Sequence, residues 1–452
     1  MRPKSFGSFA RVACLFVSAA GLLGGCGSGS GSRPDGGAVT CAPATGTGDV
    51  IVQITGLPAG VAADVILAPA SGGGTTFPAT ASTTLMVPAA GYRATAVKVA
   101  ADDPIVRAVY QPTVTMGATV CASPVAPVTV AVAYALVPSS NKVWFGNGNG
   151  GAAPLLGFAG ADLAATGSPA AAVAAMTAGA TAPAFDADGN LWVIGATSAD
   201  APVARFAAGT LGGSGAKTPD VTIDSAPFRA GVPGAAALAF DKTGGLWVSV
   251  VAARQVIRFA PAQLTASGSP TPAVVLSDIE GPAGLAFDAA GNLWVASSEA
   301  RILKFAASRL AASTTGPDLS IEAQTPAPVI GTLSDPIGLA FDGAGNLWVN
   351  YDGKLARLTA ADRAGAGDKT VTPAVQVGLD VAALPTGIAF DEGGGLWLAY
   401  AAGKFARLSA GQLAASGDVP PSTIVTSADV GYAAWVALYP APAALPLYSR
   451  LP

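Results

Sequence analysis

The sequence predicts an all-β protein, in which a six-bladed β-propeller with Velcro closure follows a small immunoglobulin-like β-sandwich. Three observations lead to this fold class. One phrase, close to GLAFDxxGNLWV, occurs in five copies between residues 181 and 398. Several short segments of alternating polarity, separated by Gly and Pro, precede these repeats. The chain contains 57 Gly and 35 Pro but only 12% charged residues, a composition that suits short strands and turns.

The composition also excludes several chemistries. The 452 residues include no histidine, which rules out a histidine general base, a Ser-His-Asp triad and a His-ligated zinc site. The formal net charge is −4. A nucleic-acid partner is therefore not expected, because binding to the phosphate backbone needs a clustered basic face.

The N-terminus has the pattern of a secretory signal. A basic stretch that contains Arg2, Lys4 and Arg11 precedes an apolar run over 12–23, which is too short to span a bilayer. Small residues then lead into Cys26, as in the lipobox of bacterial lipoproteins. We expect a lipoprotein signal peptide and lipidation of Cys26. The alternative is an ordinary signal peptide in which Cys26 has no role.

On this interpretation the signal peptide covers 1–25, and the lipidated cysteine and a Gly/Ser tether cover 26–40. An acylated cysteine anchors a protein to the lipid bilayer without a transmembrane helix. Gly27 stands where an Asp would favour retention in the inner membrane. The expected location is therefore the bacterial cell envelope, on the outer membrane.

Residues 41–138 contain five to seven short alternating segments, which favours an immunoglobulin-like sandwich. Its two cysteines, Cys41 and Cys121, are expected to form a disulfide, since an exported protein meets an oxidising compartment. Two free thiols are the alternative. No catalytic grouping is visible here, so a spacer or adhesive role is expected.

Residues 139–452 carry the repeats. Within each copy an apolar strand, a D-x-x-G turn, a strand containing Trp, a third strand and a spacer follow one another, and the spacer is expected to form a short helical turn before an outer, fourth strand. Spacings of about 50 residues and four strands per unit are typical of propeller blades. The Phe residues that mark the copies are Phe185, Phe240, Phe287, Phe341 and Phe390.

The two ends of this region predict how the ring closes. Residues 140–145 form a Trp strand with no inner strand before it, and 435–440 resemble the inner strand, with Tyr439 in place of the repeated Phe. Together the two fragments complete a sixth blade. A closed ring leaves few open sheet edges, which explains why the phrase repeats.

The repeated Asp could open a turn by accepting backbone N–H groups, or could belong to a metal array. Turn chemistry is the preferred interpretation. The repeated Trp residues are expected to pack between blades rather than stack on a ligand, and the basic residues of the third strands to lie on a solvated edge. The Asp residues are Asp186, Asp241, Asp288, Asp342 and Asp391; the Trp residues are Trp144, Trp192, Trp247, Trp294, Trp348 and Trp397; the basic residues are Arg258, Lys304, Arg357 and Arg407.

The phrase P-x-G-[LI]-A-F-D-x-x-G-N-L-W-V resembles the NHL-repeat and gluconolactonase-like (senescence marker protein) propellers, and it is also similar to streptogramin B lyase. The resemblance covers about 139–452 and implies the fold more strongly than the function. Gluconolactonase-like enzymes hold a divalent metal over the channel, and the lyase uses a catalytic histidine.

The metal ligands implied by this resemblance are not matched. The Asn position is occupied by Ala283, Ile337 and Thr386, with Ala182 and Ala236 in the less regular copies. The Asp position holds no carboxylate; its occupants are Gly195, Val250, Ser297, Tyr351, Tyr400 and Asn147. We therefore expect no catalytic residue and no cofactor, although a divalent ion such as calcium is not excluded.

The expected function is a lipid-anchored envelope protein whose propeller binds a ligand or scaffolds a partner without catalysis. A divergent metal-dependent lactonase-like hydrolase and a purely structural envelope protein are the alternatives. The expected partner is an envelope protein, a peptide or a glycan, and the protein is expected to be a monomer. The candidate binding residues at the propeller mouth are Asn147, Ser297, Asn350, Tyr351, Asp352 and Tyr400.

Overall fold

The computed structural model describes most of the chain from residue 41 onward. The described ranges are 41–42, 44–147, 155–177, 180–195, 202–231, 235–324, 337–351, 353–379, 385–400, 403–431, 433–443 and residue 445. The predicted signal peptide, Cys26, the tether and Asp352 lie outside these residues. In the ranges given, no helix is long and apolar enough to cross a membrane.

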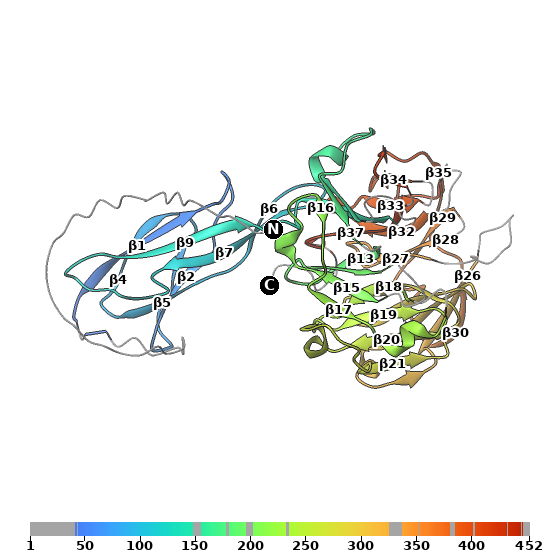
Figure 1. Cartoon of the computed structure of the whole chain (residues 1–452), viewed down its shortest axis with the longest axis horizontal. Coiled ribbons are helices and arrows are strands. Elements are labelled where there is room, and N and C mark those ends of the chain that lie inside the picture. Colours follow the sequence, from blue (N-terminus) through green and yellow to red (C-terminus); the bar gives the residue numbers. More distant parts are fainter. Residues whose placement is uncertain are drawn as a thin grey trace, which may run out of the picture.

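The N-terminal part consists of two facing sheets (Figure 1). The strands of one sheet, in spatial order, are β4 (Thr83–Pro88), β1 (Thr47–Thr55), β9 (Val128–Leu136), β7 (Ala108–Met116) and β6 (Val99–Ala101). Those of the other are β3 (Phe77–Ala79), β2 (Val65–Pro69), β5 (Gly91–Ala96) and β8 (Thr119–Cys121). Among the described residues this makes nine strands rather than five to seven, because β3, β6 and β8 have only three residues each.

Alternating side chains of the two sheets form one core. Val52, Leu67 and Val130 are fully buried there, as the period-2 pattern predicts for a strand with one apolar face. The predicted disulfide is confirmed, with 5.5 Å between the Cα atoms of Cys41 and Cys121. It ties the start of this part to β8.

The C-terminal part consists of small antiparallel sheets that share one strand order. Within the described residues there are six. The inner strands are β13 (Thr181–Phe185), β18 (Ala235–Phe240), β22 (Pro282–Phe287), β27 (Leu339–Phe341), β32 (Pro385–Phe390) and β37 (Ala433–Leu438). The second strands, which carry the Trp, are β14 (Leu191–Ile194), β19 (Leu246–Val250), β23 (Leu293–Ser297), β28 (Leu347–Tyr351), β33 (Leu396–Tyr400) and β10 (Lys142–Asn147).

Two further layers of strands lie outside these. The third strands are β15 (Val203–Phe206), β20 (Gln255–Phe259), β24 (Arg301–Phe305), β29 (Lys354–Leu358), β34 (Lys404–Leu408) and β11 (Leu155–Ala159). The fourth strands are β17 (Val221–Ile223), β21 (Val274–Ser277), β26 (Leu319–Ala323), β31 (Val375–Leu379), β36 (Thr423–Thr426) and β12 (Val173–Met176).

The inner strands surround a common axis (Figure 1). Each of them contacts the inner strand of the next sheet, and the series runs from β13 through β18, β22, β27 and β32 to β37, which contacts β13 again. This arrangement is that of a β-propeller. In the sheet of β37, residues from both ends of the region pair, since β37 is antiparallel to β10 with Ala437 opposite Trp144.

The spacers contain the predicted short helical turns, which are 3₁₀ helices. Those in spacers are η1 (Gly160–Leu163), η2 (Ala208–Thr210), η4 (Pro261–Leu264) and η5 (Ala307–Arg309). A further 3₁₀ helix, η3 (Ala226–Arg229), lies between the fourth strand β17 and the inner strand β18. Four spacers also add a strand parallel to the outer edge of the preceding sheet. These strands are β16 (Gly215–Ala216), β25 (Thr314–Thr315), β30 (Gly367–Val371) and β35 (Gly417–Val419).

The segment between β6 and β7 joins the sandwich to the hairpin turns of the propeller. The Gly393 amide donates to the carbonyl of Pro104 at 2.8 Å, and Val106 is buried in a cluster with propeller side chains. An ion pair of 3.3 Å links Arg107 to Glu392. Because backbone bonds, apolar contacts and charges all cross this junction, the two parts are held in one relative position.

Candidate binding site: the central channel

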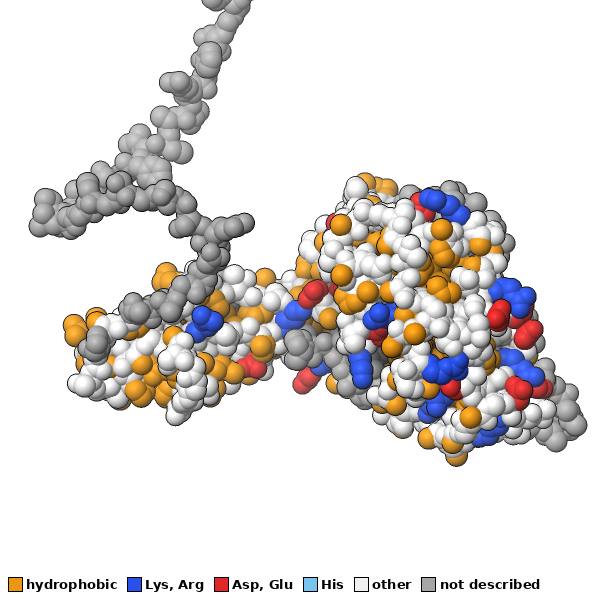
Figure 2. Space-filling view, turned by 90° about the horizontal axis from the view of Figure 1, so that it is seen from below, with side chains coloured by type: hydrophobic (Ala, Val, Ile, Leu, Met, Phe, Trp, Pro, Cys, Tyr) orange, Lys and Arg blue, Asp and Glu red, His pale blue; other side chains and the backbone are white. Residues whose placement is uncertain are grey.

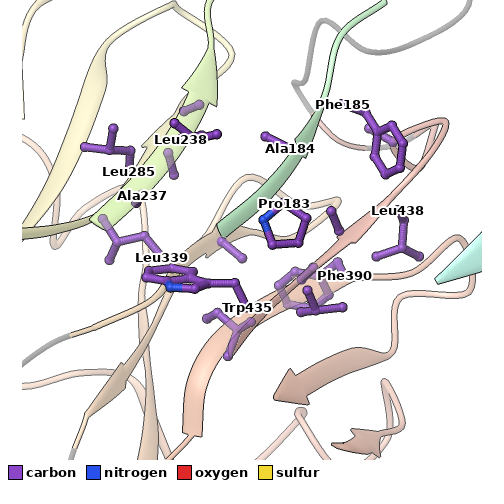
Figure 3. Close-up of a pocket in the computed structure, with 18 of the residues that line it drawn as sticks. Pro183, Ala184, Phe185, Ala237, Leu238, Leu285, Leu339, Phe390, Trp435 and Leu438 are labelled. Carbon is purple, nitrogen blue, oxygen red and sulfur yellow. The ribbon is translucent and has the colours of Figure 1, made fainter. Parts of the chain in front are cut away.

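A cavity with a volume of about 180 Å³ lies on the axis between the inner strands. Each inner strand contributes to its wall (Figure 3). Bulky side chains come from every inner strand, and one from each is Phe185, Leu238, Leu285, Leu339, Ile388 and Trp435. Alanines from the same strands separate these bulky groups, which leaves the space open.

The wall is made of hydrocarbon side chains. Its residues are Ala, Val, Leu, Ile, Phe, Pro and Trp, so the indole nitrogen of Trp435 is the sole polar side-chain atom that they contribute. None of these side chains titrates, and no group of three or more metal-ligating residues occurs among the described residues. Such a wall can bind apolar matter by desolvation but offers no acid, base or nucleophile.

Trp435 differs from the other six tryptophans. It lies in a bulge of β37, where the pairing with β10 shifts between Phe145 and Gly146, and its φ of 65° is in the left-handed region. Its side chain packs against clusters that contain Ala182 on β13 and Leu285 on β22. The indole therefore reaches from β37 toward sheets on other sides of the channel (Figure 3).

The neighbouring inner strands make room for this indole. On β32, which lies next to β37, Gly387 faces Trp435 without a side chain. A Cβ atom on Gly387 would lie 2.6 Å from the Cα of Trp435. The role of Trp435 is not predicted by the repeat pattern, in which Tyr439 stands in place of the repeated Phe. The strand pairing places Leu438 opposite Val143, as Phe185 is opposite Leu191, so Leu438 occupies the level of the repeated Phe.

The end of the channel near the hairpin turns is covered by the chain that follows β37. Ala441, Pro442 and Leu445 line the cavity there, and Leu445 is 5% exposed. The Ala443 amide donates to the Glu392 carboxylate at 3.2 Å, and Arg107 donates to the Ala441 carbonyl at 3.5 Å. The sandwich junction and this segment thus meet at one end of the channel.

The predicted mouth residues do not line the cavity. The five that the structure describes are Asn147, Ser297, Asn350, Tyr351 and Tyr400, and each is at most 3% exposed. They lie at the ends of second strands, next to the bulges of the inner strands. Asp352 lies outside the described residues.

These polar groups bond to the backbone around the bulges. Asn350 donates to the Pro385 carbonyl at 2.7 Å and accepts from the Gly338 amide. Ser297 donates to the Glu280 carbonyl at 2.6 Å, and Asn147 donates to the Asp429 carbonyl at 3.1 Å. A bulge leaves backbone groups without ladder partners, and these side chains supply the partners.

The two tyrosines differ in their hydrogen bonds. The Tyr351 hydroxyl donates to Oε1 of Gln376 at 3.1 Å. The hydroxyl of Tyr400 is buried with no hydrogen-bond partner among the described residues, and burial raises the pKa of Tyr400 above its ordinary value. Burial keeps this phenol neutral, so it cannot serve as an anionic ligand or base.

Each repeated Asp holds its hairpin turn, as predicted. In Asp288, Oδ1 accepts the amides of Ala290 at 3.0 Å and Asn292 at 2.9 Å. Its Oδ2 accepts the Asn292 side chain at 2.8 Å and the Trp294 indole at 3.0 Å. The Asp thus links the turn to the Trp strand, and its lone pairs are not available for a metal.

Two blades replace the Asn of this network by an arginine. Where Gly245 and Gly395 stand in the position of Asn292, the guanidinium groups of Arg258 and Arg407 bond to Asp241 and Asp391. A Cβ atom on either glycine would collide with that guanidinium. Burial raises the pKa of Asp241, but hydrogen bonds led by that of Arg258 outweigh it and hold the pKa at about 2.

The repeated tryptophans pack between sheets, which confirms the prediction. Trp192 meets Phe240 of the next sheet edge to face, with 6.0 Å between ring centroids, and Trp348 meets Phe390 in the same way at 6.2 Å.

The basic residues of the third strands are not simply solvated, since Lys304 lies 5.7 Å above the ring of Trp294. On the face seen in Figure 2, acidic and basic groups are interspersed over the propeller.

Comparisons with known proteins leave the family open. No protein-family model and no curated protein matches the chain. Among solved structures it is similar to streptogramin B lyase, with 18% identity over 52% of this chain and 66% of that one and a TM-score of 0.34. The match with virginiamycin B lyase from Staphylococcus aureus has 14% identity, covers 52% of this chain and 82% of that one, and has a TM-score of 0.32. At these scores the likeness says nothing about activity.

Proposed function

We propose that the protein is a lipid-anchored protein of the bacterial cell envelope, in which the sandwich is a stalk and a six-bladed propeller is a non-catalytic binding module. The apolar channel is the observation that carries the binding role. Its wall, as far as the structure describes it, offers apolar side chains and no reactive group. The predicted polar mouth residues that are described are engaged within the fold.

The number of blades and the closure of the ring are part of this proposal. Six sheets in the described residues support six blades, since each has four antiparallel strands and four of them carry one added parallel strand at the outer edge. The pairing of β10 with β37 supports Velcro closure, because it joins the two ends of the region. A bridge between Gly167 and Val425 supports a second closure at the rim.

The stalk role follows from the direction of two strands. Strand β1 runs parallel to β9, and β9 leads into the propeller. The chain therefore enters the sandwich at the end that lies away from the propeller. Nine-residue strands span roughly 30 Å, and a 14-residue Gly/Ser tether adds on the order of 20 Å. We infer that the propeller is presented well away from the membrane, where it can meet an envelope protein, a peptide or a glycan.

The anchor is tested with Cys26→Ser in the full chain. Wild-type protein is expected to take up an alkyne-labelled fatty acid and to fractionate with the outer membrane. The variant is expected to lose both properties. Label incorporation in Cys26→Ser, or release of wild-type protein in unlabelled soluble form, would contradict the lipid anchor.

The lactonase-like hydrolase remains the alternative of a different class. Metal analysis by mass spectrometry and thermal melts with calcium, zinc and a chelator separate the two. The binding module predicts no stoichiometric metal and no shift of the melting temperature. A stoichiometric metal whose removal lowers the melting temperature would favour the enzyme.

A further inference from the structure

We propose that the channel binds a small apolar molecule of about six to ten non-hydrogen atoms, such as a compact aromatic or alicyclic compound, with Trp435 as part of the binding surface. This inference rests on the proposed binding function and names the chemical class of its ligand. It concerns the channel itself and not the polar mouth predicted from the sequence.

The size of the cavity suits such a ligand. Its volume is about 180 Å³, and an apolar cavity of about 150 Å³ holds benzene or xenon while it stays free of water. A water molecule needs two to four polar partners, and the side chains of this wall provide only the indole nitrogen of Trp435. The remaining polar surface of the cavity is backbone. An apolar guest therefore gains hydrocarbon contacts with a wall whose side chains can bond to water at one atom only.

The shape of the wall also favours a flat guest. The face of the Trp435 indole lies near Leu339 and Leu285, on two other sheets (Figure 3). Aliphatic groups and an aromatic ring on different sides of a narrow space suit stacking on one face and aliphatic contact on the other.

The bulge at Trp435 is a feature that ring packing alone does not require. A bulky residue with φ of 65° is in a strained conformation, whereas the corresponding bulges use smaller residues. The other tryptophans are held between sheets, and several donate their indole N–H to a turn Asp. For the Trp435 indole no hydrogen bond is found within the described part of the chain, and its ring is partly exposed toward the cavity.

The test uses the exported full chain carrying Cys26→Ser, so that neither detergent nor lipid competes for the probes. Benzene, p-xylene and naphthalene are titrated by saturation-transfer NMR and by tryptophan emission, with glucose as the polar comparison. We expect saturable binding of at least one apolar probe, a change of emission that Trp435→Phe abolishes, and no binding of glucose.

A filled channel provides the decisive variant. Ala340→Leu adds volume to the wall and is expected to weaken probe binding at least tenfold. Ala262→Leu makes the same change on the exposed turn η4 and should leave affinity within twofold of wild type. If Ala340→Leu does not fold, Leu339→Ala replaces it, and its larger cavity should shift preference from benzene toward naphthalene.

The inference is overturned if no apolar probe binds saturably, if glucose binds in the channel, or if Ala340→Leu and Ala262→Leu bind alike. Capture of envelope components by the wild-type chain is measured in parallel. Capture without probe binding would refute the proposal of an apolar ligand in the channel and leave the proposed function intact. If neither an envelope component nor an apolar probe binds, the proposed function and the channel ligand are both refuted.

Discussion

At the residue scale, one carboxylate per turn connects three parts of a blade. The Asp closes the hairpin through its backbone bonds and fixes the orientation of the Trp through the indole N–H. That Trp in turn meets the Phe of the next sheet. A substitution at this Asp should therefore weaken both a turn and a contact between sheets.

Asp288→Ala should lower the free energy of unfolding by about 2–4 kcal/mol, because it leaves the buried Trp294 indole without an acceptor and the turn without its bonds. Denaturant unfolding measures the change. The matched control is Asp162→Ala on the exposed turn η1, which should cost less than about 0.5 kcal/mol. Equal stabilities of the two variants would show that the Asp network does not support the blade.

The free energy of unfolding at acidic pH should depend on the protonation of Asp241. Its pKa is depressed from 3.8 to about 2 in the folded protein, so the extra stability is present above about pH 4 and is lost as the pH falls toward 2. The shift is worth about 2 kcal/mol. The stability difference between wild type and Asp241→Asn should shrink between pH 5 and pH 2, followed by chemical unfolding at each pH. A difference that stays constant over this range would contradict the shift.

At the element scale, the blades differ in the side chain that donates to the Asp of the hairpin turn. Three turns use an Asn whose side chain donates to the Asp, as in Asn190 and Asn292. Two use a Gly with an Arg from the third strand, as in Gly245 with Arg258. The two solutions exclude each other, because the Asn side chain and the guanidinium occupy the same place.

This exclusion predicts a coupling between two positions. Gly245→Asn alone should destabilise the protein by displacing the guanidinium of Arg258 from Asp241. In the blade that contains Asn292, the position equivalent to Arg258 is Lys304. In the double variant Gly245→Asn/Arg258→Lys, the new Asn can therefore bond to Asp241. A double-mutant cycle should give a favourable coupling of about 1 kcal/mol or more, whereas additive effects would contradict the exchange.

Much of the blade could be predicted from the sequence, since the turn Asp, the Trp and the apolar strands recur at similar spacing and have local causes. The direction of Trp435 could not be predicted. It depends on a bulge and on the pairing of β37 with β10, which are set by residues almost 300 positions apart. The burial of Asn350 and Tyr400 was missed for the same reason, since spacing places them at strand ends but does not show what packs above them.

At the scale of the whole molecule, the two parts differ in what stabilises them. The propeller is a ring of interlocked sheets, while the sandwich has a single core and a disulfide. The joint at Pro104–Arg107 and Glu392 holds the sandwich against the turn side of the ring. The opposite end of the channel points away from the proposed membrane anchor.

Reduction of the disulfide should act on the sandwich alone. Cys41 and Cys121 are 80 residues apart, and opening such a loop costs about 4–5 kcal/mol in the chain-entropy account. All seven tryptophans lie at 144 or beyond, so their emission reports on the propeller, whereas circular dichroism reports on both parts. Reductant should lower the midpoint temperature of the part of the circular dichroism melt that belongs to the sandwich, and should leave the midpoint of the tryptophan emission melt unchanged. An equal shift of both midpoints would contradict this division.

Diffraction from crystals under xenon pressure tests whether the propeller carries the proposed apolar, non-catalytic binding channel. We predict an anomalous peak on the axis, between Leu285, Leu339, Ile388 and Trp435. A channel filled by ordered water would contradict an apolar binding site, and a metal ion with oxygen ligands there would favour the hydrolase.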